Sequence, residues 1–365
     1  MSTSARSFAK INIGLCIGRL RPDGFHELRT VYQTVALHDI VRVSVQEGSG
    51  IEIRCEAPDV PLDGTNTCFR IAQKVAEALG ASGKVLIEIE KRLPVQGGLG
   101  AASSNAVATM LALERELGRE LPFSQKMKIA AEVGSDLPLF LIGGTVVGVG
   151  RGEEVYAAPD LPPMPCVVAM PKIAVGTPAA FAAWDRWIGQ HSAPDAAMKK
   201  TAVRGSASPG PFAAAAQPAA ATTLTPPEPS DRINQFSCAV FLWLNGFLSR
   251  QDQVVTAGPT ASGVPVGKDG GRAETPLLDL VRTGIANDFE QVVFPLHPRL
   301  GEVKQALQRS GAFYASLSGS GSAVYGLFDS AQKAENTARD LQQDGIPAQV
   351  TTLLDREQYW QEVMD

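Results

Sequence analysis

The sequence LPVQGGLGAASSN, residues 93–105, contains three glycines and two serines. It lies between a strand-like stretch, VLIEIEKRL (85–93), and a helix that we expect over about 104–117, ending at Gly118. Glycines let a backbone come close to a phosphate group, and a helix N-terminus adds N–H donors. The loop is not a Walker A motif, because no Lys-Ser/Thr pair follows its last glycine, and it is not GxGxxG. Alone, it is as consistent with a tight strand-to-helix turn as with a phosphate loop.

A second stretch of small residues, ASLSGSGSAVYGLF (315–328), lies between apolar runs near the other end of the chain. One such loop is weak evidence for a nucleotide site. Two of them, in different halves of the chain, predict a nucleotide-phosphate site that is closed from two sides.

Two ionisable residues could serve chemistry at such a site. Lys10 lies inside FAKINIGLCIGR (8–19), which alternates like a half-buried strand, and there its side chain could also simply reach out to water. Asp136 lies in EVGSDLPLFLIGG, where it could also simply cap a helix. A Lys–Asp pair can activate a hydroxyl group, because the carboxylate accepts the proton and the ammonium stabilises the developing charge.

Composition excludes several classes of protein. The 365-residue chain has a net charge of −5 and no Lys/Arg cluster, so we expect no nucleic-acid partner. Its longest apolar run, FSCAVFLWLNGFL (236–248), is shorter than the roughly 20 residues that a membrane span needs. The five scattered cysteines predict reduced thiols and a cytoplasmic location. Neither they nor the four histidines have metal-ligand spacing, so we expect no metal site in the protein itself.

The chain length predicts two domains or one large one. We expect helices over 66–80 and over 125–133, the second capped by Ser124, and a strand over 144–150. Residues 205–230 hold eight alanines and six prolines, which predicts a flexible linker; a helix follows over about 231–248, and then a loose loop over 251–275. From there to about 355 the order helix, helix, strand, strand, helix, strand indicates a small α+β domain.

Four ordered segments, AKINIGLCIGRLRPDGFHEL, LPVQGGLGAASSNA, GSDLPLFLIGG and SLSGSGSAVYGLF, together resemble the motifs of the GHMP kinase superfamily. RPDGFHEL (21–28), GSDLP and NDFEQVVF (287–294) narrow the resemblance to the 4-diphosphocytidyl-2-C-methyl-D-erythritol kinases. The resemblance implies an α+β fold with an N-terminal domain like ribosomal protein S5 domain 2 (1–165) and a ferredoxin-like C-terminal domain (166–187 and 276–365). Residues 188–275 would be an insertion that holds the linker and the single helix.

The resemblance also implies a reaction, in which the γ-phosphoryl group of ATP moves to the 2-hydroxyl of the methylerythritol unit, with Mg²⁺ carried by ATP. By position, Asp136 would be the general base and Lys10 its partner. The implied ATP-binding residues are Pro94, Val95, Gln96, Gly97, Gly98, Leu99, Gly100, Ala101, Ala102, Ser103 and Ser104, with Lys91 and Asn66 near the adenosine. The implied substrate-binding residues are Asn12, on the strand face of Lys10, and Phe25, His26, Thr177 and Phe181, with Phe25 and His26 at the cytosine. The expected partner is the small-molecule substrate alone, with no nucleic acid and no membrane. The expected oligomeric state is a monomer or a weak homodimer.

The chain departs from the family pattern at three places. Ala101 and Ala102 stand where glycine is more common, Phe25 stands where tyrosine is common, and the 188–275 stretch is longer than usual. Two other functions stay open: a GHMP kinase for another small alcohol, such as homoserine or mevalonate, and a catalytically silent nucleotide-binding protein. The Phe25–His26 pair argues against the first, because it suits a flat base, and the presence of both Lys10 and Asp136 argues against the second.

Overall fold

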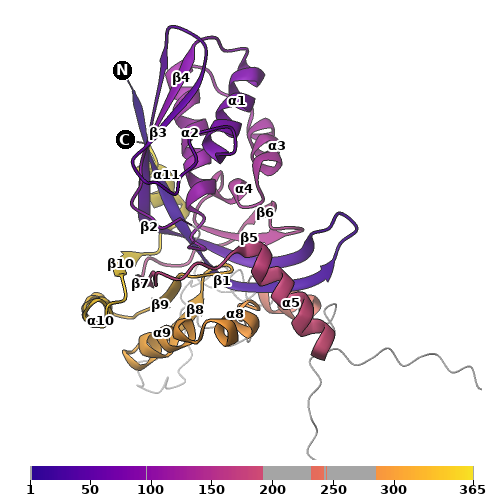
Figure 1. The fold of residues 1–365 in the computed structure, drawn as a ribbon, viewed down its shortest axis with the longest axis vertical. Coiled ribbons are helices and arrows are strands. Elements are labelled where there is room, and N and C mark those ends of the chain that lie inside the picture. Colours follow the sequence, from indigo (N-terminus) through magenta and orange to yellow (C-terminus); the bar gives the residue numbers. More distant parts are fainter. Residues whose placement is uncertain (1, 96, 192–231, 242–243, 245–284, 365) are drawn as a thin grey trace, which may run out of the picture.

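A long antiparallel hairpin organises the molecule (Figure 1). The computed structural model describes residues 2–95, 97–191, 232–241, 244 and 285–364. The hairpin consists of β1 (Thr3–Leu20) and β2 (His26–Gln46), which pair along their whole length with three shifts of register. Its middle residues are buried on both sides, because β1 and β2 run from one half of the molecule into the other and are covered by each.

The first half is a six-stranded sheet with the order β3-β4-β2-β5-β6, in which β1 pairs with β2. Helices lie together on one side of these strands (Figure 1), and Val41 and Ile87 of the sheet are buried with Met110 and Leu113 of the central helix. The remaining elements of this half are β3 (Gly50–Cys55), α1 (Thr67–Leu79), β4 (Lys84–Glu90), α2 (Ala101–Leu117), α3 (Phe123–Val133), α4 (Leu137–Phe140), β5 (Thr145–Val149) and β6 (Glu154–Ala157).

The second half is a four-stranded antiparallel sheet with the order β10-β7-β9-β8. Its core gathers Trp184, Leu300, Leu307 and Phe328, all almost completely buried. The elements are β7 (Pro165–Ala169), α5 (Thr177–His191), α8 (Glu290–Leu296), α9 (Pro298–Arg309), β8 (Tyr314–Leu317), β9 (Val324–Leu327), α10 (Ala331–Gln343) and β10 (Ala348–Thr352). From α8 to β10 the order of helices and strands is the one expected from the sequence.

Local signals set several helix ends correctly and others wrongly. α1 begins after Asn66, whose side chain accepts a hydrogen bond from the Cys68 N–H, and ends at Gly80 in the left-handed conformation. The helix expected from about 104 begins earlier, at Ala101, and ends at Gly118 as expected. The prediction that Ser124 caps the next helix is wrong. α3 starts at Phe123, and the capping position belongs to Pro122, which offers no side-chain acceptor.

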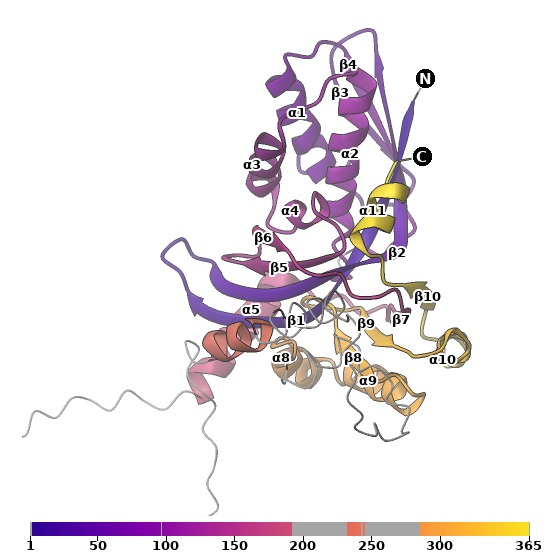
Figure 2. The same cartoon turned by 180° about the vertical axis from the view of Figure 1, so that it is seen from behind.

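The last helix, α11 (Arg356–Glu362), was not expected, and it packs on the first half of the molecule although it follows the second (Figure 2). The Tyr359 hydroxyl donates to the Phe140 carbonyl at 2.7 Å, and its ring lies 5.5 Å from that of Phe8. The Arg6 N–H donates to the Val363 carbonyl at 2.8 Å. The division into domains at about residue 165 stays a proposal. The rest of 276–365 belongs to the second half of the molecule, whereas α11 packs on the first half.

Three pieces of the 188–275 stretch are described: residues 188–191 are the end of α5, residues 232–241 are helical, within the expected 231–248, and residue 244 is helical as well. Arg232 makes an ion pair with Asp288 and lies over the Trp184 ring, 4.9 Å from its centre. Ile233 packs against Gly18 so closely that a side-chain carbon at Gly18 would lie 2.9 Å from it. This segment therefore touches both β1 and α5. The expected linker (205–230) and loop (251–275) lie outside the described residues.

Candidate active site

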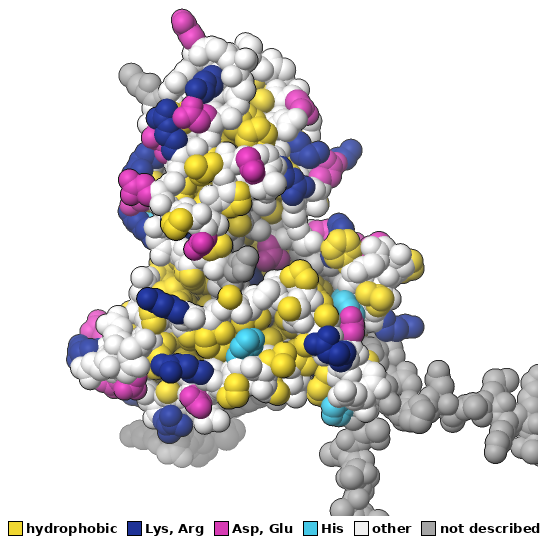
Figure 3. Space-filling view, in the orientation of Figure 1, with side chains coloured by type: hydrophobic (Ala, Val, Ile, Leu, Met, Phe, Trp, Pro, Cys, Tyr) yellow, Lys and Arg dark blue, Asp and Glu magenta, His cyan; other side chains and the backbone are white. Residues whose placement is uncertain are grey.

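A cavity of about 910 Å³ opens between the two halves, and Figure 3 shows the surface hollowed there. Its size is at the upper end of the range for small-molecule sites. Nearly all residues that the sequence proposed for the site line it. Those residues are Lys10, Asn12, Phe25, His26, Asn66, Lys91, Pro94, Val95, Gly97, Gly98, Leu99, Gly100, Ala101, Ala102, Ser103, Asp136, Thr177 and Phe181. Gln96 lies outside the described residues, and Ser104 is buried and is not part of the lining.

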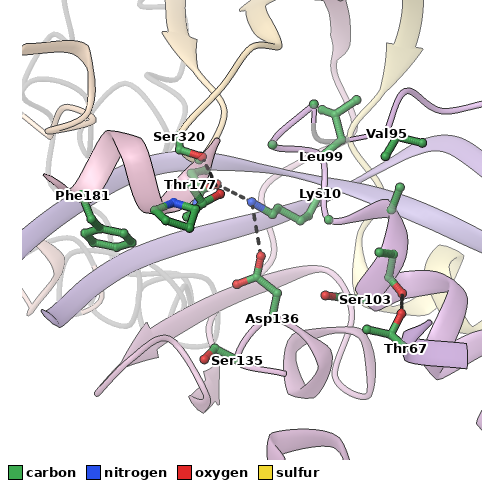
Figure 4. A pocket seen from close by; sticks show the side chains of 18 of the residues that line it. Lys10, Thr67, Val95, Leu99, Ser103, Ser135, Asp136, Thr177, Phe181 and Ser320 are labelled. Atoms are coloured by element: carbon green, nitrogen blue, oxygen red, sulfur yellow. Dashed lines mark hydrogen bonds and ion pairs between the residues drawn. The ribbon is translucent and has the colours of Figure 1, made fainter. Parts of the chain in front are cut away.

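Lys10 and Asp136 face each other in this cavity (Figure 4). The Lys10 ammonium lies 3.7 Å from Oδ2 of Asp136 and donates a 2.7 Å hydrogen bond to Oδ1 of Asn12. Lys10 is only 3% exposed, so its side chain does not reach out to bulk water. Burial lowers the pKa of the Lys10 ammonium, while the Asp136 charge acts in the opposite direction.

Asp136 occupies the capping position of α4, but its side chain makes no capping hydrogen bond. Instead, the Tyr32 hydroxyl donates to Oδ1 of Asp136 at 3.1 Å. Burial, and after it the Asp136 charge, raises the pKa of the Tyr32 phenol well above its usual value, so Tyr32 keeps its proton at neutral pH. The carboxylate is thus held by a neutral donor at one oxygen and a cation near the other.

Asn12 connects Lys10 to the floor of the site. Its amide nitrogen donates to the Thr30 hydroxyl at 2.8 Å, and that hydroxyl donates to the Gly14 carbonyl at 2.7 Å. The Tyr325 hydroxyl, from the second half, donates to the Asn12 carbonyl at 2.7 Å. Because every one of these groups is buried and hydrogen-bonded, the Lys10 ammonium has a fixed position.

The loop at 93–105 has the geometry of an anion cradle. Gly98 and Gly100 adopt the left-handed conformation, with φ of 75° and 71°, and α2 starts directly after Gly100. The first N–H groups of a helix have no partner inside it, and the first residues of α2, Ala101 to Ser103, line the cavity. Ala101 and Ala102 lie in the first turn of α2, where the backbone is helical, so alanine fits without strain.

The two glycine-rich loops touch each other across the cavity. The Ser318 hydroxyl donates to the Gly98 carbonyl at 2.9 Å, and the Ala323 N–H donates to the Gly97 carbonyl at 3.0 Å. The Asn287 amide donates to the carbonyls of Leu317 and Gly319, at 2.8 Å each, and so holds the second loop in place. The prediction of one site enclosed from two sides agrees with this arrangement.

At the expected adenosine end, Lys91 and Asn66 are already engaged by the protein. The Lys91 ammonium donates to Oδ2 of Asp39 at 2.6 Å and to the Leu93 carbonyl at 2.7 Å. Asp39 is fully buried and also accepts the Arg92 and Leu93 N–H groups, so it anchors the start of the loop. Asn66 caps α1, and its amide donates to the Pro61 carbonyl at 2.6 Å. Both residues line the cavity, and their contacts with a nucleotide stay a proposal.

At the other end, aromatic rings come together. His26, which is 8% exposed, stacks on Phe181 with ring centres 5.2 Å apart and planes 5° apart. Phe289 places its edge on Phe181 at 5.0 Å. Phe25 is half exposed near the hairpin tip, with the Arg151 guanidinium 4.9 Å from its ring centre. α5 brings the Phe181 ring onto His26, and the contact of Phe181 with a substrate base stays a proposal.

Family models match both halves of the chain. The model of the GHMP kinases N terminal domain matches residues 66–144, and that of the GHMP kinases C terminal matches residues 275–346. The 4-diphosphocytidyl-2-C-methyl-D-erythritol kinase of Solibacter usitatus (strain Ellin6076) is 33% identical over 323 residues, 88% of this chain and 80% of that protein. The one of Acaryochloris marina (strain MBIC 11017) is 32% identical over 335 residues, 92% of this chain and 89% of that protein.

The chain belongs to the 4-diphosphocytidyl-2-C-methyl-D-erythritol kinase family. A crystal structure of a 4-(cytidine 5'-diphospho)-2C-methyl-D-erythritol kinase superposes on it with a TM-score of 0.63 and 26% identity, covering 96% of this chain and 98% of that one. The resemblance inferred from the motifs is confirmed, and so is the α+β fold of the GHMP kinases. Kinases of this superfamily use ATP as the phosphoryl donor, so membership implies that this chain is an ATP-dependent phosphotransferase.

Several cavity residues of this family member were not expected from its sequence: Tyr32, Arg151, Asp185 and Ser320. Ser320 lies in the second glycine stretch and its hydroxyl is 3.0 Å from that of Thr177, which joins this loop to the start of α5. Tyr32 lies in the middle of β2, where the strand is buried on both faces, and a strand pattern does not show which carboxylate its hydroxyl reaches. Only Ser320 had a signal in the sequence, because it belongs to a loop already singled out.

Two kinds of feature are absent from the described residues. None of their helices is long and apolar enough to cross a membrane. Within the same ranges, no group of three or more His, Cys, Asp or Glu side chains could hold a metal ion.

Proposed function

We propose that this chain transfers the γ-phosphoryl group of ATP to the 2-hydroxyl of 4-diphosphocytidyl-2-C-methyl-D-erythritol, a step in the methylerythritol phosphate route to isoprenoid precursors. Family membership supports the reaction class and the substrate. The observation that carries the proposal is the meeting of the Lys10–Asp136 pair with the glycine loop. The Lys10 N–H donates to the Leu99 carbonyl at 2.9 Å, so the loop and the pair are parts of one site.

Asp136 is the proposed general base. Its carboxylate lines the cavity and is 35% exposed, so a substrate hydroxyl can reach it. Tyr32 holds Oδ1, which leaves Oδ2, beside Lys10, to accept the proton of the attacking hydroxyl. A positioned base contributes roughly 10²–10⁴ to a rate.

Lys10 is the proposed electrostatic partner. Its ammonium is fixed by Asn12 and lies next to Asp136, where it stabilises the carboxylate and the negative charge on the oxygen that attacks phosphorus. Phosphoryl transfer depends mostly on positioning and on stabilisation of charge, and a buried ammonium supplies both.

The phosphate groups of ATP would lie on the N–H groups at the start of α2 and on the loop before it, with loop 318–322 closing the other side. The donor set suits a Mg²⁺ that arrives with ATP, since a carboxylate (Asp136) and two hydroxyls (Ser103 and Ser135) line the cavity and no acidic cage is present among the described residues. When bound, Mg²⁺ supplies neutralisation of the phosphate charge.

The aromatic end of the cavity supports a substrate that carries a base. His26, Phe25 and Phe181 offer ring faces and a ring nitrogen within reach of the same opening, which a small aliphatic acid such as homoserine or mevalonate would not use. We also propose that the enzyme acts in the cytoplasm. All five cysteines are free thiols, as expected in a reducing compartment.

The test is a coupled assay of ADP release with ATP, Mg²⁺ and the cytidyl substrate, run beside homoserine and mevalonate. We expect turnover with the cytidyl substrate alone. Turnover with homoserine or mevalonate instead would support the assignment of the phosphate site and would refute the assignment of a base-binding site to His26, Phe25 and Phe181. ATP binding without turnover of any of the three would make the chain a nucleotide-binding protein.

A further inference from the structure

Asp39, on β2, is a buried carboxylate behind the glycine loop, and the function proposed above assigns it no role. It is 0% exposed and is not part of the cavity lining. Its neighbour Ile40 pairs with Glu90, the last residue of β4, so the pairing of β2 with β4 ends here. Beyond Glu90 the chain enters the loop, and the Asp39 side chain accepts the N–H groups of Arg92 and Leu93.

The two oxygens of Asp39 hold opposite ends of the glycine loop. Oδ1 accepts the N–H groups of Arg92 and Leu93, at 2.7 Å each. Oδ2 accepts the Lys91 ammonium at 2.6 Å and the Asn105 side-chain amide at 3.1 Å. Leu93 and Asn105 are the first and last residues of the glycine loop, so a single carboxylate joins its two ends.

The orientation of the Asn105 amide is fixed from its other side. The Ser7 hydroxyl, on β1, donates to Oδ1 of Asn105 at 2.5 Å, so the amide oxygen faces Ser7 and the amide nitrogen faces Asp39. Ser7 is 1% exposed and Asn105 is 4% exposed. A buried donor that loses its acceptor is costly, so these contacts strongly favour one arrangement of the loop ends.

We infer that Asp39 is a positioning residue for ATP: by joining both ends of the glycine loop, it holds the phosphate-binding N–H groups in place before ATP arrives. Glycines such as Gly97, Gly98 and Gly100 give a free loop many conformations, and fixing its ends removes most of them. The inference rests on the proposed function, because it concerns the phosphate loop of that reaction.

Two other roles for Asp39 predict different results when its charge is removed. If Asp39 only stabilised the fold, the affinity for ATP would stay unchanged. If it only neutralised Lys91, its loss would free an ammonium at the cavity wall, and the affinity for the anionic ATP would rise. Loss of a positioning contact lowers the affinity, because part of the free protein then holds the loop in conformations that do not bind phosphate.

The experiment is Asp39→Asn, which keeps the size of the side chain and releases one end of the loop. An amide has a single acceptor oxygen, so it can serve either the two backbone N–H groups or the Lys91 and Asn105 side chains, and its NH₂ group faces donors on the other side. We expect Kd for ATP with Mg²⁺, measured by calorimetry, and KM for ATP to rise on the order of 10-fold. The kcat at saturating ATP and KM for the cytidyl substrate should stay within about twofold of wild type, because bound ATP itself orders the loop.

Glu114→Gln is the matched control, because Glu114 is a similar buried carboxylate on the same helix as Asn105. One oxygen of Glu114 accepts the Leu121 N–H at 2.8 Å, the other lies 2.7 Å from the Lys126 ammonium, and Glu114 does not line the cavity. This variant should lose stability in thermal unfolding as Asp39→Asn does, yet bind ATP like wild type.

Ser7→Ala is a milder second variant, for use if Asp39→Asn does not fold. Without the Ser7 hydroxyl the Asn105 amide can turn away from Asp39, and Kd for ATP should rise about threefold.

A Kd for ATP in Asp39→Asn equal to or below that of Glu114→Gln would overturn the inference, and so would an unchanged Kd in Ser7→Ala if Asp39→Asn does not fold. Failure of the proposed function would look different. Wild type would then bind ATP without phosphorylating the cytidyl substrate, and the ratio of the Kd values of Asp39→Asn and Glu114→Gln would still decide the role of Asp39.

Discussion

The two ends of the cavity are built differently. At the reaction end, Lys10, Asn12 and Tyr32 are almost fully buried, and each makes a hydrogen bond or ion pair to a fixed neighbour. At the end with the aromatic rings, Phe25 and Asp185 are about half exposed, and the His26 ring is held between the Phe181 ring and the Asp185 carboxylate. Chemistry needs atoms at fixed positions before the substrate arrives, whereas recognition of a base can be completed by the base itself. Substitutions at the reaction end should therefore change kcat, and substitutions at the base end should change KM.

The largest effect is expected at Asp136. Asp136→Asn should lower kcat by roughly 10²- to 10⁴-fold, because the amide cannot accept the proton of the attacking hydroxyl. ATP binding, measured by calorimetry, should stay close to that of wild type, since the glycine loop is unchanged. A variant that kept near-normal turnover would show that Asp136 is not the base.

Gly98→Ala should weaken ATP binding roughly 10-fold or more. A Cβ at Gly98 would overlap the Ser318 carbonyl oxygen, and the residue has a left-handed φ of 75°, so the two loops must move apart. Gly118→Ala is the matched control, because Gly118 has a similar φ of 59° with open space around it. Equal KM values for ATP in the two variants would mean that the contact between the loops does not shape the phosphate site.

Behind the base end, Asp288 should make stability depend on pH. Burial raises the pKa of Asp288 to about 6 in the folded protein, against the partial compensation of Arg232. Because this value lies above the unfolded one, near 3.9, the folded state is favoured most below pH 4 and loses stability as the pH rises through 6. The loss is about 3 kcal/mol.

Urea unfolding of wild type and Asp288→Asn at pH 4, 5, 6 and 7 measures this contribution. The asparagine variant should lose less stability across the range, since it has no charge to bury. If the free energy of unfolding changed with pH in the same way for the two proteins, ionisation of Asp288 would not destabilise the fold, because Arg232 would compensate its charge completely.

The smallest effect is expected at Tyr32. Tyr32→Phe removes the donor to Oδ1 of Asp136 and should lower kcat about 10-fold, which corresponds to about 1.5 kcal/mol, the lower end of what a hydrogen bond to a charged group contributes. KM values should change little. Tyr359→Phe is the control, because it loses a buried 2.7 Å hydrogen bond and neither Tyr359 nor its partner Phe140 lines the cavity. An equal loss of kcat in both variants would assign the effect to stability rather than to the base.

Short-range patterns in the sequence predicted much of this site. The glycine loop, the strand with Lys10 and Asn12, and the turn with Asp136 are each contained in fewer than fifteen residues, and helix caps such as Asn66 and Gly80 are signals between near neighbours. The same patterns could not place Tyr32 on Asp136, 104 residues away, or Ser318 on Gly98, 220 residues away. Such contacts depend on how the sheets pack.

By itself, then, the sequence determined the two glycine-rich motifs, the candidate residues Lys10 and Asp136, the α+β class and the resemblance to the family, because each is carried by local periodicity or by short motifs. The tertiary structure alone decided that the two loops touch, that Tyr32 and Lys10 both reach Asp136, that α11 returns to the first half, and that Asp185 lies beside His26. These arrangements result from the packing of apolar faces that lie far apart along the chain. A hydrophobic pattern in the sequence shows that a face will be buried, but it does not show which other element will cover it.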